Sequence, residues 1–136
     1  MPLEVLRCCP SVKLPGGERK WRRMARIAGF DRKLLVRGFR KADRHDVNRI
    51  SLGTMDANGK RIVVRINHAC GWAKLSRPSA YNPLATFGHE LGHFILKQRG
   101  NREWATQRVF RSDTEQGADP VERACDRYSR LLRARS

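Results

Sequence analysis

The chain has few acidic residues and no long apolar run. Lys and Arg number 29 against 13 Asp and Glu in 136 residues, which gives a formal net charge of +16. No apolar stretch approaches the roughly 20 residues that a bilayer-spanning helix needs. Glu4 and Arg7 interrupt the region where a signal peptide would carry its apolar core. The sequence therefore predicts neither a membrane span nor a signal peptide, and we expect a cytoplasmic protein.

Cysteine is scarce, and its spacing does not suit a metal knuckle. Cys8 and Cys9 are adjacent, so a disulfide between them would be strained. Cys70 and Cys125 are isolated, and we expect them to be buried apolar side chains of a protein from a reducing compartment. Because no CxxC spacing occurs, a structural zinc knuckle is not predicted.

Length and turn signals predict a single α+β domain. Pro and Gly are frequent before residue 19, so residues 1–18 are expected to be a flexible lead-in to a domain over 19–136. Apolar spacing in the basic segment 19–44 predicts helices. Residues 48–53 and 61–66 flank the Asn-Gly turn signal of segment 56–60, which predicts a β-hairpin.

The most informative stretch is His89-Glu90-Leu91-Gly92-His93. On a helix, residues i and i+4 share a face, so His89 and His93 can grip one metal ion. Glu90 would then lie beside the metal, where a carboxylate can take a proton from water. Asn82 as N-cap, Pro83 as first helical residue and Gly100 as a stop support a helix here. A chance match on the polar face of an amphipathic helix is the alternative interpretation.

A catalytic zinc ion usually has three protein ligands, so a third is needed. No histidine follows His93, which excludes HExxHxxGxxH and points to a carboxylate from a second helix. Glu122 fits, in the first turn of a helix that begins after Asp119 and Pro120. Asp119 and Glu122 also match a capping box, in which Glu122 would only bind backbone. Cys125 and Asp126 lie one turn further, as reserve ligands, and Asp126 could instead orient a ligand histidine.

Two segments together resemble the ImmA/IrrE family of metallopeptidases. These are Thr86-Phe87-Gly88-His89-Glu90-Leu91-Gly92-His93 and, 28 residues later, Glu122-x-x-Cys125-x-x-Tyr128-Ser129. The resemblance covers roughly residues 45–132. It implies a small zincin-like fold, with a short hairpin or sheet packed on the HExxH helix and a C-terminal ligand helix. It also implies Zn²⁺ held by His89, His93 and Glu122, with Glu90 as catalytic base. Cys125 and Ser129 depart from the family, which usually has alanines there, and Tyr128 replaces a Phe.

The sequence and the resemblance lead us to expect a zinc-dependent endopeptidase. By resemblance, its substrate would be a specific regulatory protein such as a DNA-bound repressor. Tyr128, His68 and Tyr81 are candidate donors to the reacting carbonyl oxygen, and nothing separates them. Two histidines and a carboxylate would also suit Fe²⁺ or Mn²⁺. A metal-binding fold without turnover, acting as an interaction module, is a further interpretation.

The density of positive charge suggests a second function. Residues 19–49 contain twelve Lys and Arg but only three acids, which predicts attraction to phosphate backbones. Nonspecific contact with nucleic acid through 19–49 is therefore expected, and a basic nucleic-acid-binding protein with a structural or vestigial zinc site is the alternative function. Ala25, Gly29, Phe30 and Leu35 also faintly resemble a helix-turn-helix core.

Overall fold

Four strands form one mixed sheet in the computed structural model, which describes residues 2–39, 53–67, 82–102, 104 and 119–136. The strands are β1 (Glu4–Arg7), β2 (Lys33–Arg37), β3 (Gly53–Met55) and β4 (Arg61–Arg65), in the spatial order β1-β2-β4-β3. β1, β2 and β4 are parallel, whereas β3 pairs antiparallel with β4. With three helices, these strands confirm the predicted α+β class for the described residues.

The central strands are short apolar runs bounded by charges. β2 is Lys-Leu-Leu-Val-Arg and β4 is Arg-Ile-Val-Val-Arg, and they pair in register from Lys33 opposite Arg61 to Arg37 opposite Arg65. Alternate side chains of a strand point to one face. Leu34, Val36, Ile62 and Val64, which share one face by this alternation, are completely buried.

The predicted hairpin is present in the described residues, formed by β3 and β4. β3 begins at Gly53, and residues 48–52 lie outside the described residues. Asp56 Oδ1 accepts hydrogen bonds from the backbone N–H groups of Lys60 (2.9 Å) and Arg61 (3.1 Å). Gly59 has φ +69°, a left-handed conformation that favours glycine. The turn chemistry predicted from Asn-Gly therefore closes this hairpin.

Residues 2–18 are part of the fold, which corrects the prediction that segment 1–18 is a flexible lead-in. β1 adds to the sheet beside β2, in register from Glu4 opposite Lys33 to Arg7 opposite Val36. Leu3, Val12 and Leu14 belong to the core. The proline and glycine content suggested a linker, but these apolar side chains are buried between the turns.

The basic segment 19–44 is only partly helical, which corrects a second prediction. Helix α1 (Glu18–Ala28) ends at Gly29, whose φ of +77° is left-handed, and the Phe30 N–H bonds to the Ala25 carbonyl. The chain then continues into β2, and residues 40–44 lie outside the described residues. Because Leu35 is in a strand, Ala25–Leu35 is not a helix-turn-helix core. The Leu-Leu-Val run pairs in the sheet and overrides the helical spacing.

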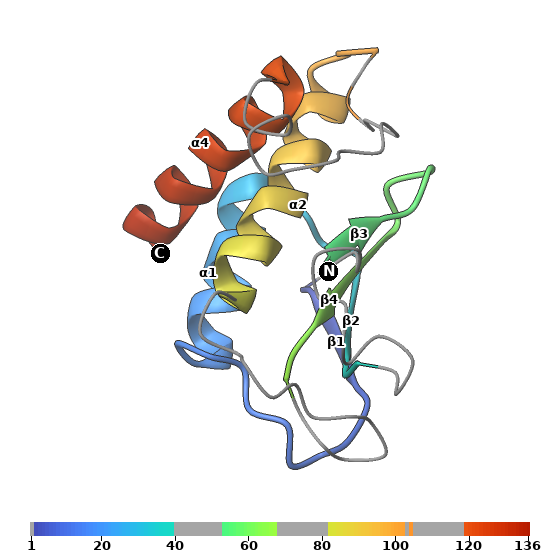
Figure 1. Cartoon of the computed structure of the whole chain (residues 1–136), viewed down its shortest axis with the longest axis vertical. Helices are drawn as coiled ribbons and strands as arrows, with labels where there is room; N and C mark the ends of the chain where they lie inside the picture. The colour runs from blue at the N-terminus through green and yellow to red at the C-terminus, as the bar shows by residue number, and fades with distance from the viewer. Residues whose placement is uncertain (1, 40–52, 68–81, 103, 105–118) are drawn as a thin grey trace.

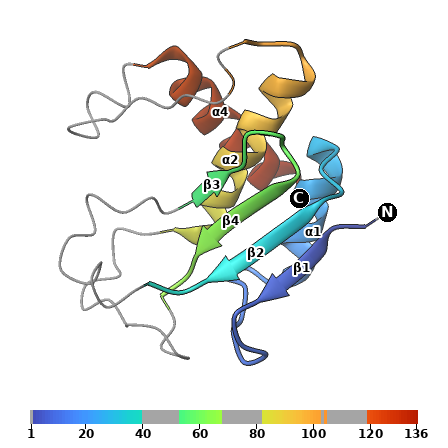
Figure 2. The same cartoon turned by 90° about the vertical axis from the view of Figure 1, so that its right-hand side faces the viewer.

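The helices lie on one side of the sheet in two layers (Figure 1; Figure 2). α1 and α2 (Pro83–Gln98) form the inner layer, with α2 in contact with β3 and β4. α4 (Pro120–Arg135) packs on α2 and α1 as the outer layer. The buried face of the sheet, α1 and α2 enclose the main core. None of the helices in the described ranges has the length and apolar character that a membrane crossing requires.

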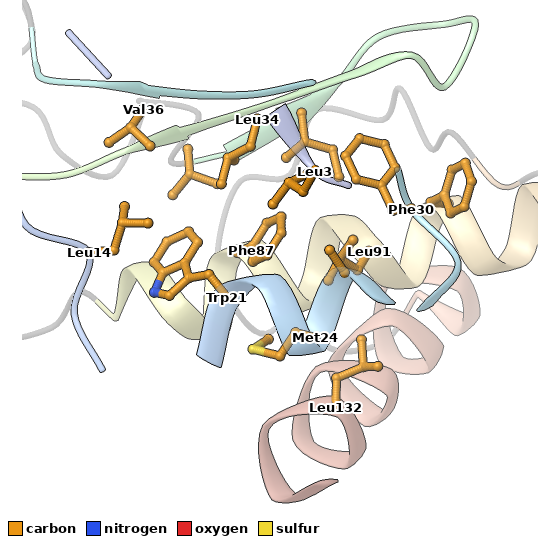
Figure 3. Close-up of a cluster of buried hydrophobic side chains, with 14 of the residues drawn as sticks. Leu3, Leu14, Trp21, Met24, Phe30, Leu34, Val36, Phe87, Leu91 and Leu132 are labelled. Atoms are coloured by element: carbon orange, nitrogen blue, oxygen red, sulfur yellow. The ribbon is translucent and has the colours of Figure 1, made fainter. Parts of the chain in front are cut away.

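Aromatic contacts join α2 to α1 and to the segment between α1 and β2 (Figure 3). Trp21 stacks on Phe87 with ring centroids 4.8 Å apart, and its indole N–H donates to the Pro15 carbonyl at 2.7 Å. Phe30 meets Phe94 edge to face at 5.1 Å. Leu132 extends this core from α4. Such aromatic pairs contribute about 0.5–1.5 kcal/mol beyond their buried area, so they stabilise the packing of α2 against α1 and Phe30.

Two glycines of α2 let α4 approach closely. A Cβ at Gly88 would lie 2.9 Å from the Cα of Ser129, and one at Gly92 would lie 2.8 Å from the Cα of Cys125. Both pairs are spaced i, i+4, so they form one line of contact along the two helices. The Ser129 hydroxyl also donates to the Ala85 carbonyl at 2.8 Å. Cys125 and Ser129, where the resembled family usually has alanines, are thus small residues facing glycines.

One cysteine is disulfide-bonded, which the cysteine spacing did not predict. Cys9 is disulfide-bonded, while Cys8 and Cys125 are free. The predicted burial of Cys125 is confirmed. The disulfide at Cys9 differs from the reducing compartment that the sequence led us to expect.

Gly92→Ala tests the close packing of α2 on α4. Alanine normally stabilises a helix over glycine by about 0.5–1 kcal/mol, but here the added methyl group would meet the α4 backbone. We expect a net loss of about 1–3 kcal/mol in the free energy of unfolding, typical of overpacking, measured by urea denaturation. The control compares the free energies of unfolding of Arg127→Ala and Arg127→Gly, at an exposed position of α4. Their difference gives the effect of alanine over glycine where no neighbouring backbone meets the methyl group. A Gly92→Ala variant more stable than wild type would contradict the close contact.

Candidate metal centre

α2 presents the HExxH side chains from a well-defined helix. Asn82 is its N-cap, with the side-chain oxygen accepting from the Ala85 N–H at 3.3 Å, and Pro83 is the first helical residue. Gly100 follows the helix end with φ +77°. The predicted start and stop signals are confirmed. His93 and Glu90 are buried, and the side chain of His89 is only 14% exposed.

α4 presents Glu122 from its first turn. Asp119 Oδ1 accepts from the N–H groups of Val121 (2.9 Å) and Glu122 (3.2 Å), which confirms the predicted N-cap. The Glu122 carboxylate lies against the two histidines of α2. The capping role and the site role are thus divided between Asp119 and Glu122.

Both imidazoles point an Nε2 atom at the Glu122 carboxylate. His89 Nε2 is 2.6 Å from Glu122 Oε2, and His93 Nε2 is 3.5 Å from Glu122 Oε1. The two rings are 5.0 Å apart between centroids and inclined by 73°. With metal–ligand bonds of about 2.0–2.1 Å, tetrahedral ligand atoms are roughly 3.3 Å apart. The His93–Glu122 separation is close to what one zinc ion needs. The shorter His89–Glu122 separation is a direct hydrogen bond, and it would have to lengthen by about 0.7 Å to admit the ion between the two groups.

The other nitrogen of each histidine is held by a fixed acceptor. His89 Nδ1 is 2.7 Å from Asp126 Oδ1, and His93 Nδ1 contacts the backbone carbonyl of Trp104. Such partners fix the ring and direct Nε2 toward a shared ligand. Asp126 was predicted as an orienting group. The Trp104 carbonyl was not, because every residue carries a backbone carbonyl and only the fold selects this one.

Cys125 lies beside the same donors. His89, His93 and Cys125 form a group that can hold a metal ion, with one ligand atom of each within 4.8 Å of the others. The Glu122 carboxylate oxygens lie 2.6 and 3.5 Å from the two Nε2 atoms, which is well within 4.8 Å. Burial raises the pKa of the Cys125 thiol, and nearby carboxylates raise it further, so the metal-free cysteine is a neutral thiol. On distance and charge, we give more weight to Glu122.

Glu90 is buried between α2 and β3. A Cβ at Gly53 would lie 3.2 Å from Glu90 Cγ and 2.5 Å from Thr86 Cγ2, so β3 passes directly over this part of α2. Burial raises the pKa of Glu90 above its ordinary value, and the two histidines oppose this shift. A carboxyl group with a raised pKa can both accept and return a proton near neutral pH.

His89 is an imidazolium in the metal-free protein. Burial lowers its pKa, but hydrogen bonds to Asp126 and Glu122 outweigh burial and raise the pKa to about 10. Its two N–H groups then donate to the two carboxylates. The hydrogen bond between His89 and Asp126 also lowers the pKa of the Asp126 carboxyl group.

Of the three candidate hydrogen-bond donors to a substrate carbonyl oxygen, only Tyr128 lies in the described residues. The Tyr128 hydroxyl accepts from Arg99 Nη1 at 2.6 Å, and its ring packs with Leu96, Val121 and Cys125. His68 and Tyr81 lie outside the described residues.

Comparison of the chain with known protein families, curated proteins and solved structures finds no match. What the site can do is therefore argued from its residues.

The raised pKa of His89 makes the stability of the metal-free protein depend on pH. A folded pKa of about 10 against 6.5 when unfolded gives a stabilisation that is complete below pH 6.5 and disappears as the pH rises toward 10. At about 1.4 kcal/mol per pKa unit, the effect is on the order of a few kcal/mol.

We therefore expect wild type to exceed His89→Gln in stability by more at pH 6 than at pH 9.5. Urea denaturation of both proteins with a chelator present measures this difference. Comparison with the variant cancels the titration of groups elsewhere. A difference that does not change between the two pH values would contradict the assignment of His89 as the charged group.

Proposed function

We propose that this chain is a zinc-dependent endopeptidase of zincin-like fold. His89, His93 and Glu122 would hold Zn²⁺, and Glu90 would be the catalytic base. The observation that carries the proposal is the convergence of both Nε2 atoms on the Glu122 carboxylate, at 2.6 and 3.5 Å. Two imidazoles and one carboxylate form a donor set typical of catalytic zinc, which keeps one coordination position open.

When bound, zinc would activate a water molecule and polarise the carbonyl of a peptide bond. Glu90 is buried and interacts electrostatically with His93, His89 and Glu122, which supports a role for its carboxylate in taking the proton of the attacking water. Its raised pKa lets it return that proton to the leaving amine. Asp126 and the Trp104 carbonyl would keep both ligand rings in position throughout.

β3 would position an extended peptide substrate. It is an end strand of the described sheet and lies over Thr86 and Glu90. An extended peptide can add to a sheet edge through backbone hydrogen bonds. A substrate bound along β3 would have its backbone near Glu90. The resemblance to ImmA/IrrE peptidases favours a regulatory protein substrate, such as a DNA-bound repressor, in the cytoplasm.

The position of Cys125 supports a second candidate, in which zinc has a structural or vestigial role in a nucleic-acid-binding protein. If the thiolate joined His89, His93 and Glu122, four protein ligands would close the coordination sphere, as in structural zinc sites. The two proposed functions therefore differ in the number of protein ligands to zinc: three for the peptidase and four for the structural site. Zinc affinities of single variants distinguish the two numbers.

Glu122→Gln and Cys125→Ala form a matched pair, one helical turn apart on the same buried side of α4. Wild type is expected to bind about one zinc ion per chain. Glu122→Gln should weaken zinc affinity by more than the roughly 10–100-fold typical of losing an orienting partner, and Cys125→Ala should change it less than about threefold. Elemental analysis and competition with a chelator measure stoichiometry and affinity, and also identify any other metal. Strong loss in both variants would indicate the closed, structural site.

Cleavage is tested with the zinc-loaded protein and a proteome-derived peptide library, with new termini read by mass spectrometry. Wild type is expected to produce them. Glu90→Gln should keep its zinc but lose activity by about 100-fold or more, in the range for removal of a general base. Glu4→Gln, at an exposed position of β1, makes the same change away from the site and should cleave normally. If Glu90→Gln produced new termini at the same rate as wild type, the catalytic role of Glu90 would be contradicted. If zinc-loaded wild type produced none, the result would favour a metal-binding fold that acts as an interaction module without turnover.

A further inference from the structure

A large share of the positive charge is concentrated on two helices. Together, α1 and α4 carry ten basic residues and three acidic ones, which leaves a net +7 of the chain's +16 on 27 of its 136 residues. Nine of the ten are arginines: Arg19, Arg22, Arg23, Arg26, Arg123, Arg127, Arg130, Arg133 and Arg135. The basic surface of the described chain is therefore not confined to the segment 19–49 singled out from sequence.

The arginines lie in rows on the solvent side of each helix. Positions i, i+4 and i+7 lie along one helix face. In α4 the row is Arg123, Arg127 and Arg130, and in α1 it is Arg19, Arg23 and Arg26, all of them exposed. We call these six residues the arginine face.

The three acids of the two helices do not neutralise this face. Glu18 is paired with Arg7 and Arg22. Asp126 is hydrogen-bonded to His89 and also attracts Arg130 electrostatically, and Glu122 is buried against the histidines. Within the described part of the chain, no ion pair within 4.0 Å involves a member of the arginine face. Apart from the attraction between Asp126 and Arg130, its guanidinium groups therefore remain available for an external anion.

The two rows belong to adjoining helices. The Lys20 ammonium donates to the Arg133 carbonyl at 2.9 Å, and Met24 of α1 lies in the same core cluster as Leu132 of α4. Figure 1 shows α4 beside α1 on the side of the molecule away from the sheet. The two rows are thus carried by adjoining helices that pack on the same core.

We propose that the arginine face binds the phosphate backbone of duplex DNA without reading its sequence. Guanidinium groups match phosphate oxygens in a two-pronged hydrogen-bonding geometry, and neutralising phosphates releases counterions and drives binding. This proposal does not depend on the proposed peptidase activity.

The chemistry of the face favours DNA over other polyanions. A membrane-surface helix turns its apolar side to lipid, but here the apolar sides of α1 and α4 are in the core, and only Ile27 (47% exposed) and Leu131 (50%) are exposed. Single-stranded nucleic acid binds by stacking on aromatic rings, and the exposed sides of the two helices carry no exposed aromatic residue. They also carry no exposed Ser, Thr, Asn or Gln of the kind that contacts RNA 2′-hydroxyls.

Two triple variants with equal net charge test the proposal in the full chain. Arg123, Arg127 and Arg130, each changed to Gln, remove three charges from the face. Lys13, Lys33 and Lys60, each changed to Gln, remove three exposed charges elsewhere. Binding to a 20-base-pair duplex DNA is followed by fluorescence anisotropy over a series of salt concentrations. Zinc content and the urea midpoint confirm that each variant is folded.

We expect the triple arginine variant to bind DNA at least about 10-fold more weakly than wild type at 0.1 M salt. The slope of log K against log salt concentration should become shallower by about two to three, because each lost phosphate contact contributes about 0.9. The lysine variant should stay within about twofold of wild type. Glu90→Gln should bind like wild type, so failure of catalysis and failure of DNA binding are distinguishable. Equal losses in both triple variants would overturn the proposal and indicate unlocalised charge attraction. Tighter binding to anionic phosphatidylglycerol vesicles, single-stranded DNA or duplex RNA would also overturn it.

Discussion

The close approach of α2 and α4 is the constraint on which the site depends. Gly88 and Gly92 remove the side chains that would otherwise separate the helices, and Ser129 and Cys125 fill the contact. At this separation, a glutamate one turn before Cys125 reaches histidines on the facing helix. Because metal ligands must lie within a few ångströms of one another, side chains at both glycine positions would push the helices apart and separate Glu122 from the two histidines. The glycines and the donors therefore belong to one structural unit.

The site concentrates charged groups where water is largely excluded. Glu90, Glu122 and the two histidines are nearly buried, and burying charge is costly unless the charges compensate one another. In the metal-free protein, the His89 imidazolium between Glu122 and Asp126 provides part of that compensation. A divalent cation would replace the proton and supply more positive charge at the same position. The arrangement thus suits a cation whether or not turnover follows.

α4 has two sides with separate chemistry. Its inner side carries Glu122, Cys125 and Ser129 against α2, and its outer side carries the row Arg123, Arg127 and Arg130. Proposed catalysis and proposed DNA contact therefore share a helix but no side chain. A peptidase held on DNA would meet DNA-bound proteins at a raised local concentration, which agrees with the substrate class that the family resemblance suggests.

Local signals in the sequence determined much of this protein. The i, i+4 histidines, the caps Asn82 and Asp119 and the Asn-Gly turn act over a few residues, so helix bounds, the hairpin and the metal-site candidates were predictable. Only the tertiary structure decided the rest, because it depends on contacts between distant segments. The pairing of Glu4–Arg7 with β2 overrode a linker-like composition. The Leu34–Val36 run became a strand because neighbouring strands pair with it on both sides. The approach of Glu122 and Cys125 to the two histidines and the selection of the Trp104 carbonyl depend on how α2 and α4 pack. The placing of two arginine rows on adjoining helices depends on how α1 and α4 pack. No local pattern encodes either arrangement.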